Sequence, residues 1–192
     1  LLPLDEGETI TTVMKLPECE DDCKDMSIMF ATSQGNVRRN SLMDFVNVQS
    51  NGKIAMKLDE GDKLINVRIC HEDNDIMLAA RSGKCIRFPV TDVRVFVGRN
   101  STGVRGIKLA EGDEVISMSI LLHSDATSEE RDEYARIASA IKRISAERGD
   151  DSCVSPEDTG LLNVLTTEKY KEMAEREQFI LSVTSTGYGK RT

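Results

Sequence analysis

The sequence repeats itself, and its repeated units constrain the fold more than any other feature. Three copies of a first unit occupy Met29–Arg39, Met77–Arg87 and Leu181–Arg191. In each copy an apolar run leads into a turn that contains a glycine, Gly35 in the first copy, and a basic residue follows four positions later. Because a glycine turn between two strand-like runs is typical of a β-hairpin, each copy predicts one hairpin.

A second unit alternates with the first and carries an acidic turn with a glycine. Its copies lie at Leu2–Leu16, where it is degraded, and at Ile54–Ile69 and Ile107–Ile120. Apolar residues alternate on either side of the turn, so this unit also predicts a hairpin. Where no insertion separates them, the turn glycines of neighbouring copies are 48 to 54 residues apart. Two hairpins per period indicate four-stranded blades, and the predicted fold is all-β, a partial β-pinwheel or propeller with an inserted helical hairpin.

The insertion lengthens one period by about 53 residues, roughly between His123 and Glu175. Thr127 with Glu130 matches a capping box, and apolar residues from Tyr134 to Ile144 recur at helical spacing. A second helical stretch is expected at Thr167–Glu177. One domain is therefore expected over residues 1–192, with blade repeats at about 1–122 and 176–192 and the insertion at about 123–175. Its charged surface fits solvent exposure, and contact with a partner is the alternative.

The charge of the chain is divided by region. The formal net charge is −8, but residues 27–109 contain 13 Lys and Arg against 8 Asp and Glu. The middle is therefore basic by 5 charges and the flanks are acidic by 13. Nucleic-acid binding needs a basic surface to neutralise phosphates, and the blade region can supply one.

The candidate DNA contacts are cations that recur at matching places in the repeats. One set follows the hairpin turns, and the other lies in and after the second unit: Arg38, Arg39, Arg87, Lys190 and Arg191, then Lys53, Lys57, Arg99, Arg105 and Lys108. Regular spacing makes such charges a track for a phosphate backbone, whereas the bland alternative is a solvated strand face. No base-reading helix accompanies them, which predicts sequence-independent phosphate contacts and specificity through DNA bending.

No catalytic or metal-binding constellation is evident. The two histidines, His71 and His123, lie 52 positions apart, and Cys19 and Cys23 have no histidine near them. We therefore expect no catalytic residue, metal or cofactor in this chain. Five cysteines without a secretory signal or a long apolar run indicate a cytoplasmic protein with no membrane segment.

Four stretches carry a resemblance to a known family. They are Gly98–Leu109, Asn51–Leu58, Met29–Arg39 and the final Gly187–Thr192. Together they resemble the C-terminal domain of the DNA gyrase A subunit. The resemblance implies a six-bladed pinwheel that wraps double-stranded DNA, within a type IIA topoisomerase that supercoils DNA negatively. It also implies ATP and Mg in the holoenzyme, a heterotetramer with the gyrase B subunit and a second A subunit, and a nucleoid-associated place in the cytoplasm.

The glutamine-arginine-glycine-lysine box of the family is missing from this sequence, so DNA binding is expected more firmly than wrapping.

Two other functions stay open. The corresponding subunit of topoisomerase IV is one alternative. A propeller that binds proteins through its helical insertion is the other, and this reading would account for the net acidity.

Overall fold

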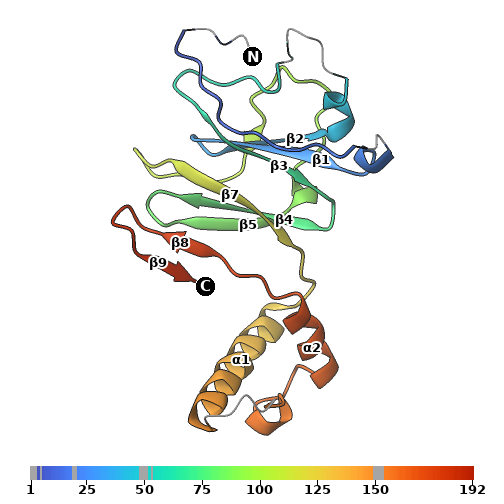
Figure 1. Cartoon of the computed structure of the whole chain (residues 1–192), viewed down its shortest axis with the longest axis vertical. Helices are drawn as coiled ribbons and strands as arrows, with labels where there is room; N and C mark the ends of the chain where they lie inside the picture. Colours follow the sequence, from blue (N-terminus) through green and yellow to red (C-terminus); the bar gives the residue numbers. More distant parts are fainter. Residues whose placement is uncertain (1–3, 5, 19–20, 48–51, 53, 149–153) are drawn as a thin grey trace. The chain divides into compact units, whose positions relative to one another are not determined.

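The computed structural model describes residues 4, 6–18, 21–47, 52, 54–148 and 154–192. The chain forms two compact parts, an N-terminal part, Leu1–His123, and a C-terminal part, Ser124–Thr192. Figure 1 shows that the N-terminal part is built of sheets and that the C-terminal part contains α1 and α2. An all-β architecture with an inserted helical hairpin, as predicted, is what the chain adopts.

The described residues of the N-terminal part form two antiparallel sheets. Sheet A has the order β3-β1-β2-β6, and its strands are β1 (Ser27–Thr32), β2 (Asn36–Ser41), β3 (Leu64–Cys70) and β6 (Val104–Arg105). Sheet B has the order β5-β4-β7, with β4 (Asn74–Ala80), β5 (Cys85–Pro89) and β7 (Val115–Leu122). Short 3-10 helices lie at Asp21–Cys23, Leu42–Phe45 and Val90–Asp92.

The three predicted hairpins are confirmed, and they share one register. β1 pairs with β2, β4 with β5, and β8 (Leu181–Val183) with β9 (Gly189–Arg191). The same pair joins the ends of each unit: Met29 with Arg39, Met77 with Arg87, and Leu181 with Arg191. The repeated basic residues are therefore structurally equivalent.

The prediction of a hairpin for the second unit is wrong. Residues 54–58 and 107–109 are not strands, and only the later arms of the Ile54 and Ile107 copies pair, β3 with β1 and β7 with β4. The described residues of the Leu2–Leu16 copy form no strand. The early arm of the Ile107 copy instead packs on sheet A, where the amides of Gly106 and Ile107 donate to the Gly35 carbonyl. The alternation of apolar residues gave the right strand but could not reveal that its two arms serve different sheets.

The aspartate after each acidic turn fastens a first-unit hairpin. Asp62 accepts hydrogen bonds from Ser33 Oγ (2.8 Å), the Gln34 amide (2.9 Å) and the Lys63 amide (2.8 Å). Asp113 repeats the arrangement with the Ser82 amide (3.1 Å) and hydroxyl (2.7 Å). Backbone bonds from Ser33 to Lys63 and from Arg81 to Glu114 accompany the two clasps. The Ile54 and Ile107 copies of the second unit are thus tied to the turns of the first two copies of the first unit.

Two apolar clusters hold the sheets. One lies between sheets A and B and includes Met29, Val37, Ile76, Leu78 and Val115. The other covers the opposite side of β1, with Phe30 and Leu42 fully buried. Since β1 is buried at every position, it contributes side chains to both clusters. Thin, aliphatic packing of this kind suits a chain with few aromatic residues.

Two glycines of the Gly98–Leu109 stretch allow it to cross β2 closely. Gly103 has a φ of +88°, and a Cβ there would lie 2.2 Å from the Val37 carbonyl oxygen. A Cβ on Gly106 would lie 2.8 Å from a Val37 methyl group and 2.9 Å from one of Leu78. Only glycine fits at both places without displacing β2.

The C-terminal part is built around α1 (Ser128–Arg148) and α2 (Thr167–Glu175). The predicted capping box is confirmed, because the Thr127 amide donates to Glu130 Oε2 and the Glu130 amide donates to Thr127 Oγ1. The helices pack through Ile137 and through the rings of Tyr134 and Tyr170, whose centroids are 4.9 Å apart. A 3-10 turn at Glu157–Thr159 lies between them in the chain.

Glu133 fastens the C-terminal part through hydrogen bonds to its carboxylate, as Asp62 and Asp113 do in the N-terminal part. Its carboxylate accepts hydrogen bonds from the amides of Asn163, Val164 and Leu165 at 2.7 to 3.1 Å. These bonds lower the pKa of Glu133 below its usual value. A charged residue on α1 thus holds the segment that leads into α2.

Candidate nucleic-acid interface

Arg38 and Arg39 are buried, which corrects the prediction that they contact phosphates. Arg38 is 0% exposed, and its Nη1 donates to the Ser101 carbonyl oxygen at 2.9 Å. Burial and the charge of Arg99 lower the pKa of Arg38, and Asp44 opposes that shift. Arg39 is 4% exposed, and it donates to Ser27 Oγ and to Glu72 Oε1, both at 2.9 Å. Both side chains therefore hold sheet A together.

The neighbours of each strand explain why equivalent arginines differ. Arg39 lies on β2, which has β1 on one side and β6 on the other, and Arg39 itself bridges to Val95. Arg87 lies on β5, an edge strand of sheet B, and its side chain is 42% exposed. A repeat in sequence fixes the register of these residues but not the covering of each strand.

Arg87 is exposed yet partly engaged within sheet B. Its Nε lies 2.6 Å from Asp75 Oδ2, and its Nη2 donates to the Leu122 carbonyl oxygen at 3.0 Å. Asp75 is buried and also contacts His123 Nδ1 at 2.7 Å. Because the side chain is 42% exposed, Arg87 can add a phosphate contact while it keeps its bond to Asp75.

Three exposed cations lie on the turn before β5, on β6 and on the stretch that follows β6. We call Lys84, Arg105 and Lys108 the edge cluster. Lys84 Nζ donates to the Lys108 carbonyl oxygen at 2.8 Å, which brings the two residues together. Arg105 borders a hollow of about 240 Å³ that is also lined by Ile86 and Phe88 of β5 and by one carboxylate, Asp92. Lys84 was not predicted, because the residues that follow Gly35 and Gly187 are not basic and the repeat therefore gives no signal there.

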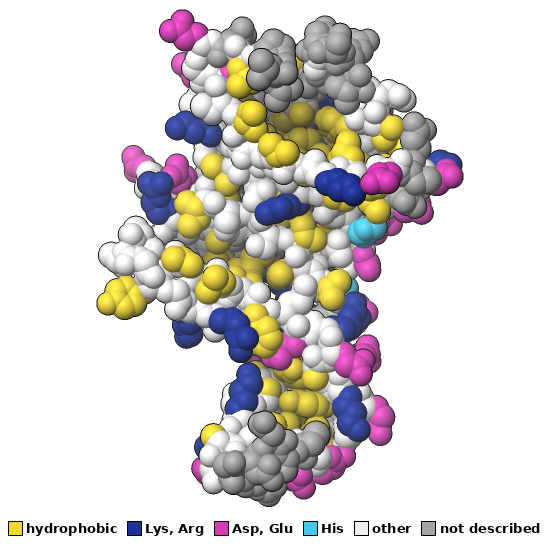
Figure 2. Space-filling model, viewed as in Figure 1, with side chains coloured by type: hydrophobic (Ala, Val, Ile, Leu, Met, Phe, Trp, Pro, Cys, Tyr) yellow, Lys and Arg dark blue, Asp and Glu magenta, His cyan; other side chains and the backbone are white. Residues whose placement is uncertain are grey.

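The remaining predicted cations of the N-terminal part are not members of the edge cluster or fall outside the described residues. Lys57 is exposed, Arg99 is half-buried, and Lys53 falls outside the described residues. Arg94 was not predicted. It is exposed and stacks on the Phe96 ring at 4.1 Å, and Arg38 lies 5.4 Å from the same ring. Figure 2 shows that basic side chains on the viewed face lie singly among apolar and acidic ones.

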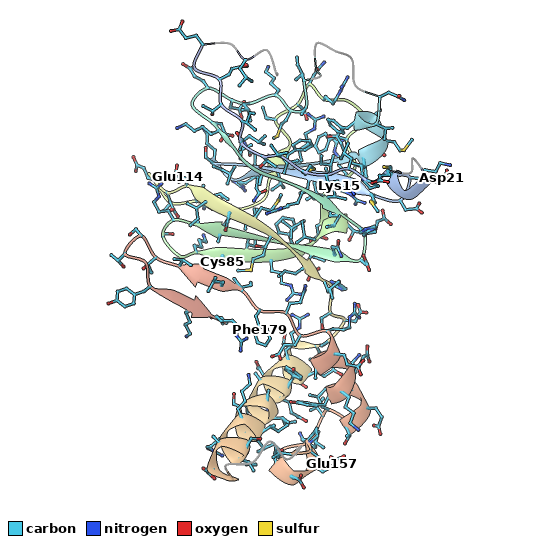
Figure 3. The ribbon with its side chains drawn as sticks, viewed as in Figure 1. Lys15, Asp21, Cys85, Glu114, Glu157 and Phe179 are labelled. Carbon is cyan, nitrogen blue, oxygen red and sulfur yellow. The ribbon has the colours of Figure 1, made fainter. Side chains whose placement is uncertain are left out.

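The cations of the last hairpin are exposed, as a phosphate contact requires. Lys190 and Arg191 lie on β9, and the Arg191 guanidinium carbon is 4.4 Å from the centre of the Phe179 ring. Phe179 is 46% exposed and lies on the segment that joins α2 to β8 (Figure 3). An arginine stacked on an aromatic ring keeps its edge donors free for an anion.

No cluster of three or more His, Cys, Asp and Glu that could hold a metal occurs among the described residues. Burial raises the pKa of the Cys70 thiol to about 11, which keeps it protonated near neutral pH. No helix in the described part of the chain is long and apolar enough to cross a membrane. The fold and the exposed cations define a repeat-built β-propeller-type binding domain.

The comparisons with known proteins agree with this class. A model of the family described as DNA gyrase C-terminal domain, beta-propeller, matches residues 27–71, 74–121 and 178–192. The DNA gyrase A subunit of Rickettsia bellii is 50% identical over 192 residues, which is 100% of this chain and 21% of that protein. The same protein from Granulibacter bethesdensis is 50% identical over 204 residues, with the same coverage. The chain belongs to the DNA gyrase C-terminal domain family.

A solved structure supports the fold independently. The C-terminal domain of Escherichia coli ParC matches with a TM-score of 0.51 and 18% identity, over 63% of this chain and 49% of that one. The chain spans about a fifth of the length of the curated relatives named above. Residues 122–177 lie outside the matched ranges of the family model, although the Rickettsia alignment covers the whole chain.

Proposed function

We propose that this chain is a DNA-contacting part of a DNA gyrase A subunit, which binds the duplex backbone without reading its sequence. Family membership supports this role, because relatives that are 50% identical over the whole chain are gyrase A subunits. The observation that carries the proposal is the exposure of four cations, Arg105, Lys108, Lys190 and Arg191. Such cations bind phosphates through charge and hydrogen bonds.

The same relatives, which are DNA gyrase A subunits, support a proposal for the surrounding assembly. We propose that the whole protein is an ATP-hydrolysing type IIA topoisomerase that supercoils DNA negatively, using Mg and a heterotetramer with the gyrase B subunit and a second A subunit. Its place would be the cytoplasm, at the nucleoid. The chain contributes DNA contacts and no catalytic residue. The sequence matches favour gyrase over topoisomerase IV, and a protein-docking role for the helical insertion stays a prediction.

The edge cluster provides the sharpest test. In a triple variant, Lys84→Gln, Arg105→Gln and Lys108→Gln remove three exposed charges. The matched control is Lys15→Gln, Lys24→Gln and Arg81→Gln, which changes the net charge equally at residues already paired with Glu18, Asp21 and Glu114. Binding of a duplex of mixed sequence is measured across a range of salt concentrations.

We expect the wild-type affinity to fall steeply with salt, by about 0.9 in the logarithmic slope for each phosphate contact. The edge variant loses roughly two to three contacts from that slope, and the control retains it. Equal slopes for the edge variant and the control would remove the edge cluster from the interface. A wild-type chain whose affinity ignores salt would contradict the proposal as a whole.

A further inference from the structure

The inserted helix α1 carries its charges in two separate stretches. Its beginning is acidic, with Glu129, Glu130, Asp132 and Glu133. From Tyr134 to Ala146 it contains three cations, Arg136, Lys142 and Arg143, and no carboxylate. The helix thus has a basic part, although the segment from 123 to 175 as a whole is acidic. The matched ranges of the family model leave this segment out.

One of these cations meets the last hairpin at an aromatic ring. Lys142 Nζ lies 6.0 Å from the centre of the Phe179 ring, and Arg191 Cζ lies 4.4 Å from the same centre. Lys142 comes from α1 and Arg191 from β9, and pairing with Leu181 fixes the place of Arg191 on the hairpin. The fold therefore brings two cations of distant origin to one half-exposed ring.

Neither cation is neutralised by a neighbour in the described part of the chain. No ion pair to a carboxylate is made there by Lys142 or by Arg191. Two like charges near one ring repel each other, and an anion between them relieves that repulsion. A DNA backbone offers both parts that this surface can use, a phosphate for the cations and an apolar sugar for the ring.

Helix stabilisation does not account for Lys142. A cation favours a helix through the macrodipole only within the last turn, and Lys142 lies six residues before Arg148, where α1 ends. Its distance from the Phe179 ring is at the outer limit of a cation–π contact, about 6 Å, so that contact contributes little. Lys142 is exposed, so its ammonium group is available to a ligand outside the chain.

We infer that Lys142 of the inserted helix contacts the DNA backbone together with Arg191 and Phe179, so that the insertion extends the DNA surface of the last hairpin. The inference rests on the proposed function and adds to it a role for residues outside the matched family ranges. The partner it names is a phosphodiester backbone of duplex DNA, bound without base recognition.

The test compares Lys142→Gln, Lys142→Arg and Lys169→Gln in the whole chain. Lys169→Gln is the matched control, because it removes one charge from the same C-terminal part, at a residue paired with Glu172 at 3.2 Å. Duplex binding is measured as a function of salt. We expect Lys142→Gln to reduce the logarithmic salt slope by about 0.9 and to weaken binding at low salt several-fold, about 3- to 10-fold. Lys142→Arg should restore the slope, and Lys169→Gln should leave it unchanged.

A measurement on the wild-type chain covers the case in which Lys142→Gln does not fold. Bound duplex should protect the Lys142 amine from acetylation and leave the Lys169 amine reactive. An unchanged salt slope in folded Lys142→Gln, or equal acetylation of Lys142 with and without DNA, would overturn the inference while the edge-cluster result stands. Salt-independent binding by the wild-type chain would instead overturn the proposed function itself.

Discussion

At the scale of single residues, the environment decides what a repeated residue does. Arg39, Arg87 and Arg191 hold the same place in three hairpins, yet one is buried, one is tied to Asp75 and one stacks on an exposed ring. The equivalent aspartates differ in the same manner, because Asp62 is buried and Asp113 is partly exposed. A repeat therefore preserves geometry more faithfully than it preserves chemistry.

Asp62 should make the stability of the N-terminal part depend on pH. Burial raises its pKa, but hydrogen bonds from Thr32, Gln34, Ser33 and Lys63 outweigh burial and leave the pKa below 3.8. A lowered pKa in the folded state stabilises above the unfolded value, and that stability is lost as the pH falls through the folded pKa. We expect Asp62→Asn to cost about 1 to 3 kcal/mol at neutral pH.

The measurement is urea unfolding of the wild type and of Asp62→Asn at neutral pH and along an acid series that passes below the folded pKa of Asp62. The difference in unfolding free energy between them should shrink at the acidic end, since the carboxyl group is then protonated in the wild type. Asp113→Asn serves as the comparison and should destabilise less. A constant difference at every pH would mean that the charge of Asp62 is not what fastens the hairpin.

At the scale of elements, the sequence predicted what is local and missed what depends on neighbours. The three hairpins, the capping box of Thr127 and the two helices follow from turn chemistry and apolar spacing, which act within a few residues. The role of the second unit did not follow, because Ile107 bonds to the Gly35 turn of sheet A while Val115 opens a strand of sheet B. The contacts of the buried Arg38 and Arg39 are also distant in sequence, to Ser101 and Glu72 respectively.

Glu133 gives the element-scale prediction. Three amides donate to its carboxylate, so Glu133→Gln should loosen the segment from Asn163 to Leu165 without unfolding α1. Hydrogen exchange read by NMR should show these three amides exchanging faster, while amides in the middle of α1 keep their protection. Unchanged exchange at Asn163, Val164 and Leu165 would show that another contact holds the segment.

The same bond has a pH signature. The pKa of Glu133 is lowered by the backbone bonds, so its stabilising contribution is complete above 4.5, the ordinary value, and is lost as the pH falls through the folded pKa. In the wild type, exchange at the three amides, corrected for its intrinsic pH dependence, should therefore quicken on acidification. In Glu133→Gln that response should be absent.

At the scale of the whole molecule, the uneven charge explains how an acidic chain can bind an anion. Its net charge is −8, but the blade region is basic by 5 charges, and α1 adds a basic stretch inside an acidic segment. Long-range attraction to DNA is therefore weak, and binding depends on cations that reach phosphates directly. Such contacts are screened within about 10 Å at 0.1 M salt.

Sequence independence is the prediction at this scale. Duplexes of equal length but different base composition should bind within about threefold of each other, because phosphates carry no sequence information. Fluorescence anisotropy with AT-rich, GC-rich and mixed duplexes at one salt concentration measures this. Preference should appear only with duplexes that differ in bending stiffness. Strong discrimination between equally flexible duplexes would point to base contacts that these residues do not offer.

The segment from Gly106 to Leu122 has a mechanical consequence. Its beginning is bonded to the Gly35 turn of sheet A, and its end is paired along the length of β4 in sheet B. A force that pulls β7 away from β4 is transmitted through this short tether to the neighbouring sheet. The two sheets therefore share load, and a curved polymer that presses on one of them strains the other as well.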